Sequence, residues 1–377
     1  MEALILSCGT GGGHNSAGKA VMEELIRRGH HAVMLNPYTL QSGRLAGKID
    51  RIYISTVKKM PEVFGAVYRI GEVYRKLPGR SPVYYINRGM VPVMAKYLRR
   101  HHFDVVIMPH LFPAEVLTNM KERGMQLPKT IYVATDYCCI PFTEETDCDA
   151  YIIPTKELTG DFSGRGIPRE KIYPFGIPVL RGFSDTVMQE EAKRRLGLAP
   201  EKKYILISGG SMGTGGIGKM LHLLLAYTGK NSRIHPIVIC GNNKKLYAGL
   251  KRRCGKKVTV VGYTEQIVDY MKASCLYITK PGGLSSTEAA VCGVPLVHMP
   301  PIPGCETKNI RYFTENGMSL ACVITKRGIR QVIGLLNDGR ARAAMLACQG
   351  KHIAKDAAVR ICELAEGMAG EQGVGEK

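Results

Sequence analysis

Short apolar runs rich in valine and isoleucine alternate with helical stretches along the whole chain, and the series starts again past its middle. Such alternation is typical of parallel sheets built from strand-helix-strand units. The predicted strands of the first series are residues 3–7, 31–35, 105–108, 131–134, 151–153 and 172–175. Those of the second series are residues 204–208, 237–240, 258–261, 276–279 and 295–298. The sequence therefore predicts two α/β domains, each with a parallel sheet.

The break between the two series falls in a basic stretch near residues 178–200. A chain of 377 residues is too long for one compact core and about right for two. We predict an N-terminal domain at residues 1–180 and a second domain at residues 181–340. Residues 341–377 are predicted to form a C-terminal helix, from about Arg340 to Met368, and a frayed tail.

The formal net charge of +20 points to an anionic partner, which can be nucleic acid, an anionic lipid surface or a phosphorylated small molecule. Residues 40–100 hold thirteen lysines and arginines against three acids, interleaved with aromatic side chains. Residues 244–257 hold seven basic side chains and no acid. The 12 cysteines have no zinc-ligand spacing and indicate a reducing cytoplasm. No apolar run approaches the roughly 20 residues that cross a bilayer, and the start lacks a basic leader.

Each half opens with a strand that runs directly into glycines and then into a helix. The first turn contains Gly12 and Gly13, and the second contains Gly210, Ser211 and Gly213. Glycine allows backbone N–H groups and a helix N-terminus to approach an anion closely, so both turns are candidate phosphate sites. The alternative for either turn is a tight strand-to-helix connection.

Two nucleotide motifs overlap the first turn. Residues 13–19 resemble the start of a phosphate-binding P-loop, but Ala20 stands where a hydroxyl residue would hold magnesium. Residues 9–14 resemble a dinucleotide fingerprint with His14 in place of the last glycine, where its ring would obstruct close helix packing. The sequence therefore favours neither an NTPase nor a nicotinamide enzyme.

His14 lies at the predicted helix start beside the first turn. A helix N-terminus disfavours the protonated ring and leaves a neutral imidazole that can accept a proton. We therefore interpret His14 as a general base, with a structural cap of the turn as the alternative.

Three C-terminal segments carry a longer pattern: TKPGGLSSTEAA at residues 279–290, GVPLVH at 293–298 and PIPGCETKN at 301–309. This pattern resembles the sugar-nucleotide signature of the diacylglycerol glycosyltransferases, the family of monogalactosyldiacylglycerol synthases and processive diacylglycerol glucosyltransferases. The family is similar to the bacterial transferase that makes lipid II. The glycine turn before His14 and the pair Thr135 and Asp136 fit the same resemblance.

The resemblance implies a GT-B fold of two facing Rossmann-like domains, with the donor on the C-terminal domain and the acceptor on the N-terminal one. It implies inversion at the anomeric carbon without a metal, and a UDP-sugar donor in place of any cofactor. It also implies that Asp136 is either a reserve base or the group that orients His14. The residues that the resemblance assigns to the donor are Gly210, Ser211 and Gly213 near the diphosphate, Gly262 and Tyr263 beside the uracil, Gly282, Gly283, Ser285 and Ser286 at the phosphates, Glu288 at the ribose, and Pro303, Gly304, Cys305, Glu306 and Asn309 at the hexose.

One departure from the family pattern and one alternative role bear on this assignment. Cys305 replaces the glutamine that family members usually carry, so one hydrogen bond to a sugar hydroxyl is missing or replaced. Glu288 also fits a structural role as an acid in the first turns of a helix. Asp147 and Asp149 have the DxD form of metal-dependent transferases of another fold, but a strand follows them directly and no metal role is assigned.

The predicted function is hexose transfer from a UDP-sugar to a lipid hydroxyl, that of diacylglycerol. We predict a cytoplasmic enzyme that is peripheral on the inner face of the cell membrane, with residues 40–100 as the candidate docking region and a solvated helical face as the alternative. The alternative functions are a UDP-sugar epimerase, a transferase for a polyprenyl-linked acceptor, and a non-catalytic UDP-sugar-binding regulator. No nucleic-acid-binding module is present in the sequence.

Overall fold

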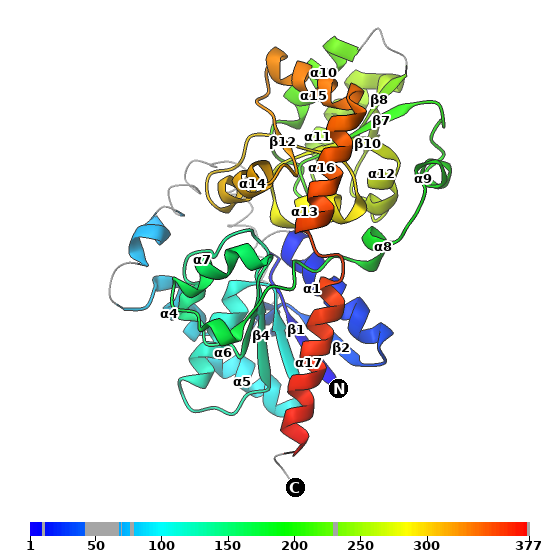
Figure 1. Ribbon diagram of the computed structural model, residues 1–377. Helices are drawn as coiled ribbons and strands as arrows, with labels where there is room; N and C mark the ends of the chain where they lie inside the picture. Colours follow the sequence, from blue (N-terminus) through cyan, green and yellow to red (C-terminus); the bar gives the residue numbers. More distant parts are fainter. Residues whose placement is uncertain (10–11, 42–67, 69, 76–78, 229–232, 375–377) are drawn as a thin grey trace. The chain divides into compact units, whose positions relative to one another are not determined.

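The computed structural model describes the whole chain except residues 10–11, 42–67, 69, 76–78, 229–232 and 375–377. The chain forms two compact units, each with its own sheet and core (Figure 1). The first unit comprises Met1–Arg181, Pro303–Cys305 and Ala354–Lys377, and the second comprises Gly182–Ile302 and Glu306–Ile353.

The first unit contains a parallel sheet of six strands in the order β2-β1-β3-β4-β5-β6. Its strands are β1 (Glu2–Leu6), β2 (His31–Leu35), β3 (Val105–Met108), β4 (Lys129–Val133), β5 (Ala150–Ile152) and β6 (Ile172–Tyr173). All neighbouring strands pair in parallel, and residues of β1 lie opposite those of both β2 and β3. The predicted parallel sheet is therefore confirmed.

Successive residues of these strands enter two different cores, one on each face of the sheet. Ala3 and Ile5 of β1 belong to one core, whereas Leu4 and Leu6 belong to the other. Burial on both faces explains the continuous apolar runs of the sequence, because neither face is left to carry polar side chains. Gly18 brings the first helix close to the sheet, since an added Cβ would lie 3.1 Å from both Ile5 Cγ2 and Met34 Cε.

The helices of the first unit cover both faces of its sheet. They are α1 (Gly12–Arg27), α4 (Pro82–Arg88), α5 (Val91–Arg100), α6 (Leu111–Lys121), α7 (Thr159–Ser163) and α17 (Ala357–Val374), with short 3₁₀ helices η1 (Pro37–Leu40), η2 (Thr143–Glu145), η3 (Lys156–Leu158) and η4 (Arg169–Lys171). No helix in the described part of the chain is both long and apolar enough to cross a bilayer.

The second unit contains another parallel sheet of six strands, in the order β12-β11-β10-β7-β8-β9. Its strands are β7 (Lys203–Ser208), β8 (Ile234–Ile239), β9 (Thr259–Val261), β10 (Ser274–Thr279), β11 (Leu296–His298) and β12 (Leu320–Ala321). The helices of this part of the chain, in order, are α8 (Arg181–Ser184), α9 (Gln189–Arg195), α10 (Ile217–Thr228), α11 (Lys244–Cys254), η5 (Gly255–Lys257), α12 (Ile267–Lys272), α13 (Gly283–Cys292), α14 (Cys305–Glu315), α15 (Lys326–Asn337) and α16 (Gly339–His352).

The C-terminal segment differs from the single helix predicted for it. It forms two helices, of which α16 packs in the second unit and α17 packs on the sheet of the first. Gly176, with a φ of 104°, makes room for this return, because an added Cβ would lie 3.1 Å from the Cβ of Ala354 and 3.2 Å from that of Ala357. Helix α17 extends to Val374, and the remainder of the predicted tail lies outside the described residues.

Hydrogen bonds of Glu366 connect α17 to the rest of the first unit. Its carboxylate accepts hydrogen bonds from Arg28 at 2.8 and 2.6 Å, and lies 2.7 Å from Nε2 of His30. The hydrogen bond from Arg28 is the main reason that the pKa of Glu366 is lowered to about 2. This carboxylate therefore stabilises the fold when it is ionised.

We expect Glu366→Gln to lower the free energy of unfolding by about 1 kcal/mol near neutral pH, because the pair is partly exposed. A lowered carboxyl pKa contributes stability above its unfolded value of about 4.5 and loses that contribution as the pH falls from there towards 2. The difference in the free energy of unfolding between the variant and the wild type, measured by urea denaturation, should thus shrink below about pH 5. Glu363→Gln, an exposed position on the same helix, is the control. A difference that stays constant with pH would contradict the assignment.

Candidate active site

The strand order of each sheet reverses at one point, and the candidate residues gather there. In the first unit β1 lies between β2 and β3, and in the second unit β7 lies between β8 and β10. The connections leave neighbouring strands in opposite directions at such a point, so a crevice opens beyond their carboxyl ends. His14 follows β1 at one reversal, and the second glycine turn follows β7 at the other.

His14 is held by the loops that follow β3 and β4. Its Nδ1 lies 2.7 Å from the carbonyl oxygen of Pro109 and 3.0 Å from Oγ1 of Thr135. A carbonyl oxygen only accepts hydrogen bonds, so Nδ1 carries the ring proton of the neutral imidazole. The lone pair that can take a proton is therefore on Nε2, and the fixed tautomer suits a general base.

The protonation state of His14 results from opposing influences. Burial lowers its pKa below the usual value, while the negative charge of Asp136 and the hydrogen bond to Pro109 act to raise it. The ring is thus neutral near pH 7, and its protonated form is stabilised by the neighbouring carboxylate. Asp136, which follows Thr135 after β4, acts on His14 through this charge.

A second imidazole, which the sequence analysis did not assign to the site, lies beside the first. The rings of His110 and His14 are 4.5 Å apart in an edge-to-face arrangement. Nδ1 of His110 accepts a hydrogen bond from the backbone N–H of Phe112 and so caps α6. Burial and the charge of His14 hold the pKa of His110 well below its usual value, so a proton taken up by this pair resides on His14.

The first glycine turn differs from the predicted phosphate loop. Helix α1 already begins at Gly12, so Gly12 and Gly13 belong to its first turn, and Gly11 lies outside the described residues. Lys19 is exposed on the same helix. The P-loop alternative is wrong, because residues 13–19 are helical and do not wrap around an anion.

The second glycine turn packs backbone against backbone. Gly213 has a φ of 59°, and a Cβ there would lie 2.1 Å from the carbonyl oxygen of Cys240. A Cβ on Gly241 would lie 2.4 Å from the carbonyl oxygen of Ser211. Asn243 secures the contact, since its Nδ2 donates to the Gly213 carbonyl at 2.9 Å. A side chain is therefore excluded at Gly213 and at Gly241, where the two backbones meet.

Lys280 lies between this turn and the start of α13, and the sequence analysis did not single it out. A Cβ on Gly210 would lie 3.4 Å from Cε of Lys280, and one on Gly282 would lie 3.8 Å from Nζ. Nζ forms a largely buried ion pair with Glu306, whose other oxygen accepts from the backbone N–H of Ile302 at 2.9 Å. Gly282 caps α13 without a side-chain hydrogen bond. A cation and a helix N-terminus thus adjoin, which is an arrangement that binds phosphate.

Glu288 lies in the second turn of α13, partly buried. Burial alone raises its pKa to about 8, so the carboxyl group is mostly protonated near neutral pH. A ligand whose hydroxyl groups donate to the carboxylate would favour the ionised form and release a proton on binding.

Two residues assigned to the donor are fully buried and bond within the protein. Oγ of Ser286 lies 2.9 Å from Nε2 of His298, and Nδ2 of Asn309 donates to the carbonyl oxygen of Pro281 at 3.1 Å. Their side chains support the turn that contains Gly282, and this geometry does not favour the direct phosphate and hexose contacts predicted for them.

The remaining assigned residues lie on loops or helix starts of the chain. Gly262 and the 62% exposed Tyr263 follow β9. Gly283 and Ser285 lie in the first turn of α13, and Pro303, Gly304 and Cys305 lead into α14. Their roles as donor contacts stay predictions.

The acids of the DxD sequence serve the fold of the first unit. Asp147 pairs with Lys121 at 3.0 Å and with Lys171 at 2.9 Å, and Asp149 accepts from the backbone N–H and hydroxyl of Thr130. Among the described residues no group of acids, histidines and cysteines is arranged to hold a metal.

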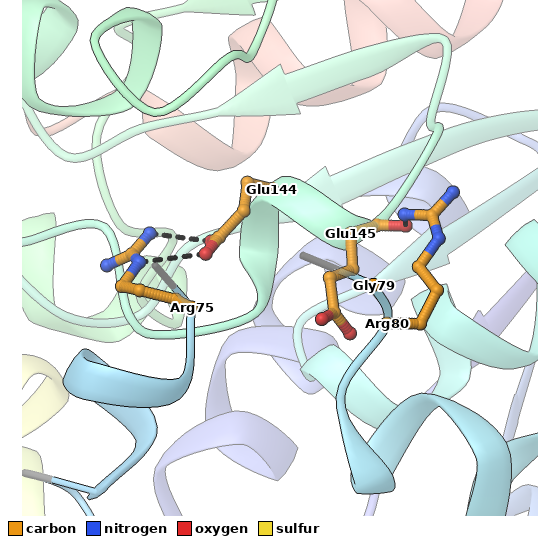
Figure 2. Close-up of a pocket in the computed structure, with 5 residues that line it drawn as sticks. All are labelled: Arg75, Gly79, Arg80, Glu144 and Glu145. Carbon is orange, nitrogen blue, oxygen red and sulfur yellow. Dashed lines mark hydrogen bonds and ion pairs between the residues drawn. The ribbon is translucent and has the colours of Figure 1, made fainter. Parts of the chain in front are cut away.

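A pocket of about 340 Å³ lies elsewhere in the first unit, as Figure 2 shows. It is lined by Arg75, Gly79, Arg80, Glu144 and Glu145. Arg75 donates two hydrogen bonds to Glu144, at 2.8 and 2.6 Å, and Arg80 donates to the Glu145 carbonyl at 2.8 Å. The carboxylate of Glu145 accepts from Ser81, so each charged side chain of this pocket already has a partner in the protein and we assign no ligand to it.

Comparison with known families accounts for both units. Residues 14–179 match the monogalactosyldiacylglycerol (MGDG) synthase family, and residues 204–361 match the glycosyltransferase family 28 C-terminal domain. The chain belongs to the MGDG synthase family of glycosyltransferases.

Relatives of this glycosyltransferase match it over most of its length. The processive diacylglycerol beta-glucosyltransferase of Bacillus subtilis is 26% identical over 344 residues, which are 89% of this chain and 87% of the relative. The enzyme of the same name from Staphylococcus aureus strain MRSA252 is 26% identical over 369 residues, covering 96% and 91%.

Solved structures with little sequence identity share the fold. MurG of Acinetobacter baumannii is 14% identical with a TM-score of 0.62, covering 97% of this chain and 99% of that chain. The UDP-GlcNAc 2-epimerase of Neisseria meningitidis, bound to UDP-GlcNAc, is 12% identical with a TM-score of 0.64 and the same coverage. With the two parallel sheets, these likenesses confirm the predicted GT-B fold of two Rossmann-like units.

We expect Lys280→Met to weaken UDP binding by roughly tenfold or more, because a charge-assisted hydrogen bond to phosphate is lost. The variant also leaves Glu306 without its cation, which destabilises the fold. Lys280→Met/Glu306→Gln removes both charges, and it should recover stability without recovering affinity. Titration calorimetry with UDP and thermal unfolding separate the two effects. Unchanged UDP affinity in the double variant would remove Lys280 from the site.

We expect the affinity for UDP-glucose to rise from pH 6 to about pH 8 and then to level off. The raised pKa of Glu288 means that binding to the carboxylate must expel a proton below about pH 8, so acid weakens binding. UDP-glucose is the suitable probe because both of its phosphates are esterified, whereas a terminal phosphate itself titrates near pH 6. Glu288→Gln should flatten the dependence, and an unchanged slope in this variant would show that another group is responsible.

Proposed function

We propose that this glycosyltransferase transfers a hexose from a UDP-sugar to the hydroxyl group of diacylglycerol, with inversion at the anomeric carbon and without a metal. The observation that carries the proposal is His14, a neutral imidazole whose proton is fixed on Nδ1 by Pro109 and whose basic nitrogen is Nε2. The family and the names of the relatives support the class of donor and acceptor.

In the proposed reaction Nε2 of His14 takes the proton of the acceptor hydroxyl as that oxygen attacks the anomeric carbon. The new bond joins the acceptor oxygen to this carbon, and the bond from the carbon to the UDP oxygen breaks with its electron pair. The carboxylate of Asp136 stabilises the imidazolium that forms. His110 stays neutral beside it, so the proton is not divided between the two rings.

The departing diphosphate gains charge as the bond breaks, and the second unit supplies groups of opposite polarity. These are the ammonium group of Lys280, the first N–H groups of α13 and the main chain of the second glycine turn. Groups held in place before the reaction stabilise a developing charge without reorganisation. In this proposal they do the work that a metal does in other transferases.

Three alternative functions would give different experimental results. A UDP-sugar epimerase, whose fold this chain shares, converts its substrate without an acceptor. A transferase for a polyprenyl-linked acceptor uses the same donor groups, and a regulator binds UDP-sugar without turnover. Membership of a glycosyltransferase family favours transfer.

We further propose that the enzyme acts in the cytoplasm at the inner face of the membrane, where its lipid acceptor is reached.

The proposal is tested by a mass-spectrometric screen of UDP-glucose, UDP-galactose and UDP-N-acetylglucosamine against diacylglycerol and polyprenyl phosphate vesicles. We expect a glycosyl diacylglycerol with one of the UDP-hexoses. Conversion of a UDP-sugar without acceptor would favour the epimerase, and binding without any product would favour the regulator.

We expect His14→Ala to lower kcat by at least about 100-fold, the usual contribution of a general base, with UDP affinity unchanged. His110→Asn is the matched control, since its side-chain oxygen can still accept from Phe112 N–H and cap α6. It should retain far more activity than His14→Ala. Full activity in His14→Ala would show that another group is the base.

A further inference from the structure

Helix α11 and the 3₁₀ helix η5 that follows it form a strongly basic surface of the second unit. The seven basic side chains of this segment are all exposed, and the segment contains no acid. We call this segment, residues 244–257, the α11 surface. Its basic residues are Lys244, Lys245, Lys251, Arg252, Arg253, Lys256 and Lys257.

The charges of the α11 surface are not used to hold the protein together. Among the described residues no ion pair involves any of them, whereas other exposed arginines do pair, as Arg194 and Arg195 do with Glu191. Lys244 and Lys245 lie in the first turn of α11, where the helix dipole disfavours a positive charge. Lys251 lies 5.9 Å from the ring centre of Tyr247 and Arg253 donates to the Gly249 carbonyl, but no acid of the described residues neutralises any of the seven charges. Seven like charges without a neutralising acid indicate an external anionic partner.

In the basic region predicted for membrane docking, two of the described cations are neutralised by acids, whereas Arg88, Lys96, Arg99 and Arg100 have no ion pair among the described residues. Of residues 40–100, the structure describes only part, and in that part Arg75 pairs with Glu72 and Glu144. Arg80 pairs with Glu122 and also lies 5.0 Å from the ring centre of Tyr84. Charges that are neutralised within the protein attract a distant anionic surface less.

We propose that the α11 surface docks the enzyme on an anionic lipid bilayer. The inference rests on the proposed function in one respect. An enzyme with a lipid acceptor must meet a bilayer, and this bilayer is then the anionic partner. The length of this basic segment suits a plane of lipid head groups, since α11 extends about 16 Å and η5 continues it. A cluster of several lysines and arginines is the sequence pattern that binds anionic head groups.

The α11 surface is joined directly to the second glycine turn. Asn243 caps α11 by accepting from the backbone N–H of Leu246 at 3.0 Å, and it donates to the Gly213 carbonyl. The backbone N–H of Asn242 donates to the Ser211 carbonyl at 2.8 Å. A bilayer that holds α11 thus holds a helix whose cap is part of the candidate donor site.

The test is flotation of the purified full chain with phosphatidylcholine vesicles, with and without phosphatidylglycerol. The vesicles contain no diacylglycerol and no UDP-sugar, so docking is measured even if the proposed reaction is wrong. We expect binding only to the anionic vesicles, and its loss when salt is raised to about 1 M, where the screening length is about 3 Å.

Three triple variants with the same change in net charge locate the docking surface. The first is Lys251→Glu/Arg252→Glu/Lys256→Glu on the α11 surface. The second is Lys96→Glu/Arg99→Glu/Arg100→Glu on α5, within the region that the sequence favours, and the third is Lys326→Glu/Arg327→Glu/Arg330→Glu on α15. All nine side chains are exposed. We expect the first variant to lose roughly 100-fold in affinity, since each cation contributes about fivefold near an anionic surface, and the others to lose far less.

Several results would overturn the proposal. One is equal binding of the wild type to neutral and anionic vesicles. Others are equal losses of vesicle affinity in all three variants, or a loss confined to the α5 variant. The last is an α11 variant that loses binding to duplex DNA but not to vesicles. UDP binding serves as the check on folding. If the glutamate variant does not fold, Lys251→Gln/Arg252→Gln/Lys256→Gln replaces it and must still lose affinity, because the same three cations are removed.

Discussion

The parallel sheets, buried on both faces, are the constraint on which the candidate site depends. A strand with apolar neighbours on both sides carries no free polar side chains, so the chemistry is confined to the loops at its ends. Because the strands of each sheet run in one direction, these loops meet at one edge. His14 lies in the first turn of α1, and Pro109 and Thr135 come from two such loops of the first unit, although 121 residues separate His14 from Thr135.

Electrostatics at the edge of each sheet follows from partial burial. In the first unit His14 is kept neutral by burial, and the nearby carboxylate of Asp136 stabilises the imidazolium once a proton is taken up. Lys280 and Glu306 illustrate the opposite case, where two ionised groups share a largely buried position and compensate each other. A phosphate that arrived beside Lys280 would compete with Glu306 for the same ammonium group.

Much of the fold could be predicted because burial leaves a mark in sequence, as the apolar runs that became β3 and β10 show. Strand β12, with two residues, was missed because it is too short to produce a pattern. The division between α16 and α17 was missed because it depends on the contact with Gly176, far away in the chain. Residue type alone selects His14 as the candidate base, and its role stays a prediction. The sequence could not show the tautomer that the Pro109 carbonyl fixes, or that the first glycine turn lies inside a helix.

The return of α17 to the first unit makes the second unit an insertion in the sequence of the first. Ile5, Val21 and Leu25 therefore pack against Ile361 and Ala365, which are synthesised more than 300 residues later. A nascent chain that has completed the first sheet must leave this apolar face uncovered while the entire second unit is made. Contacts between the ends of a chain form slowly, and exposed apolar surface promotes aggregation in the interval. The order of synthesis thus leaves this face open to aggregation until α17 has been made.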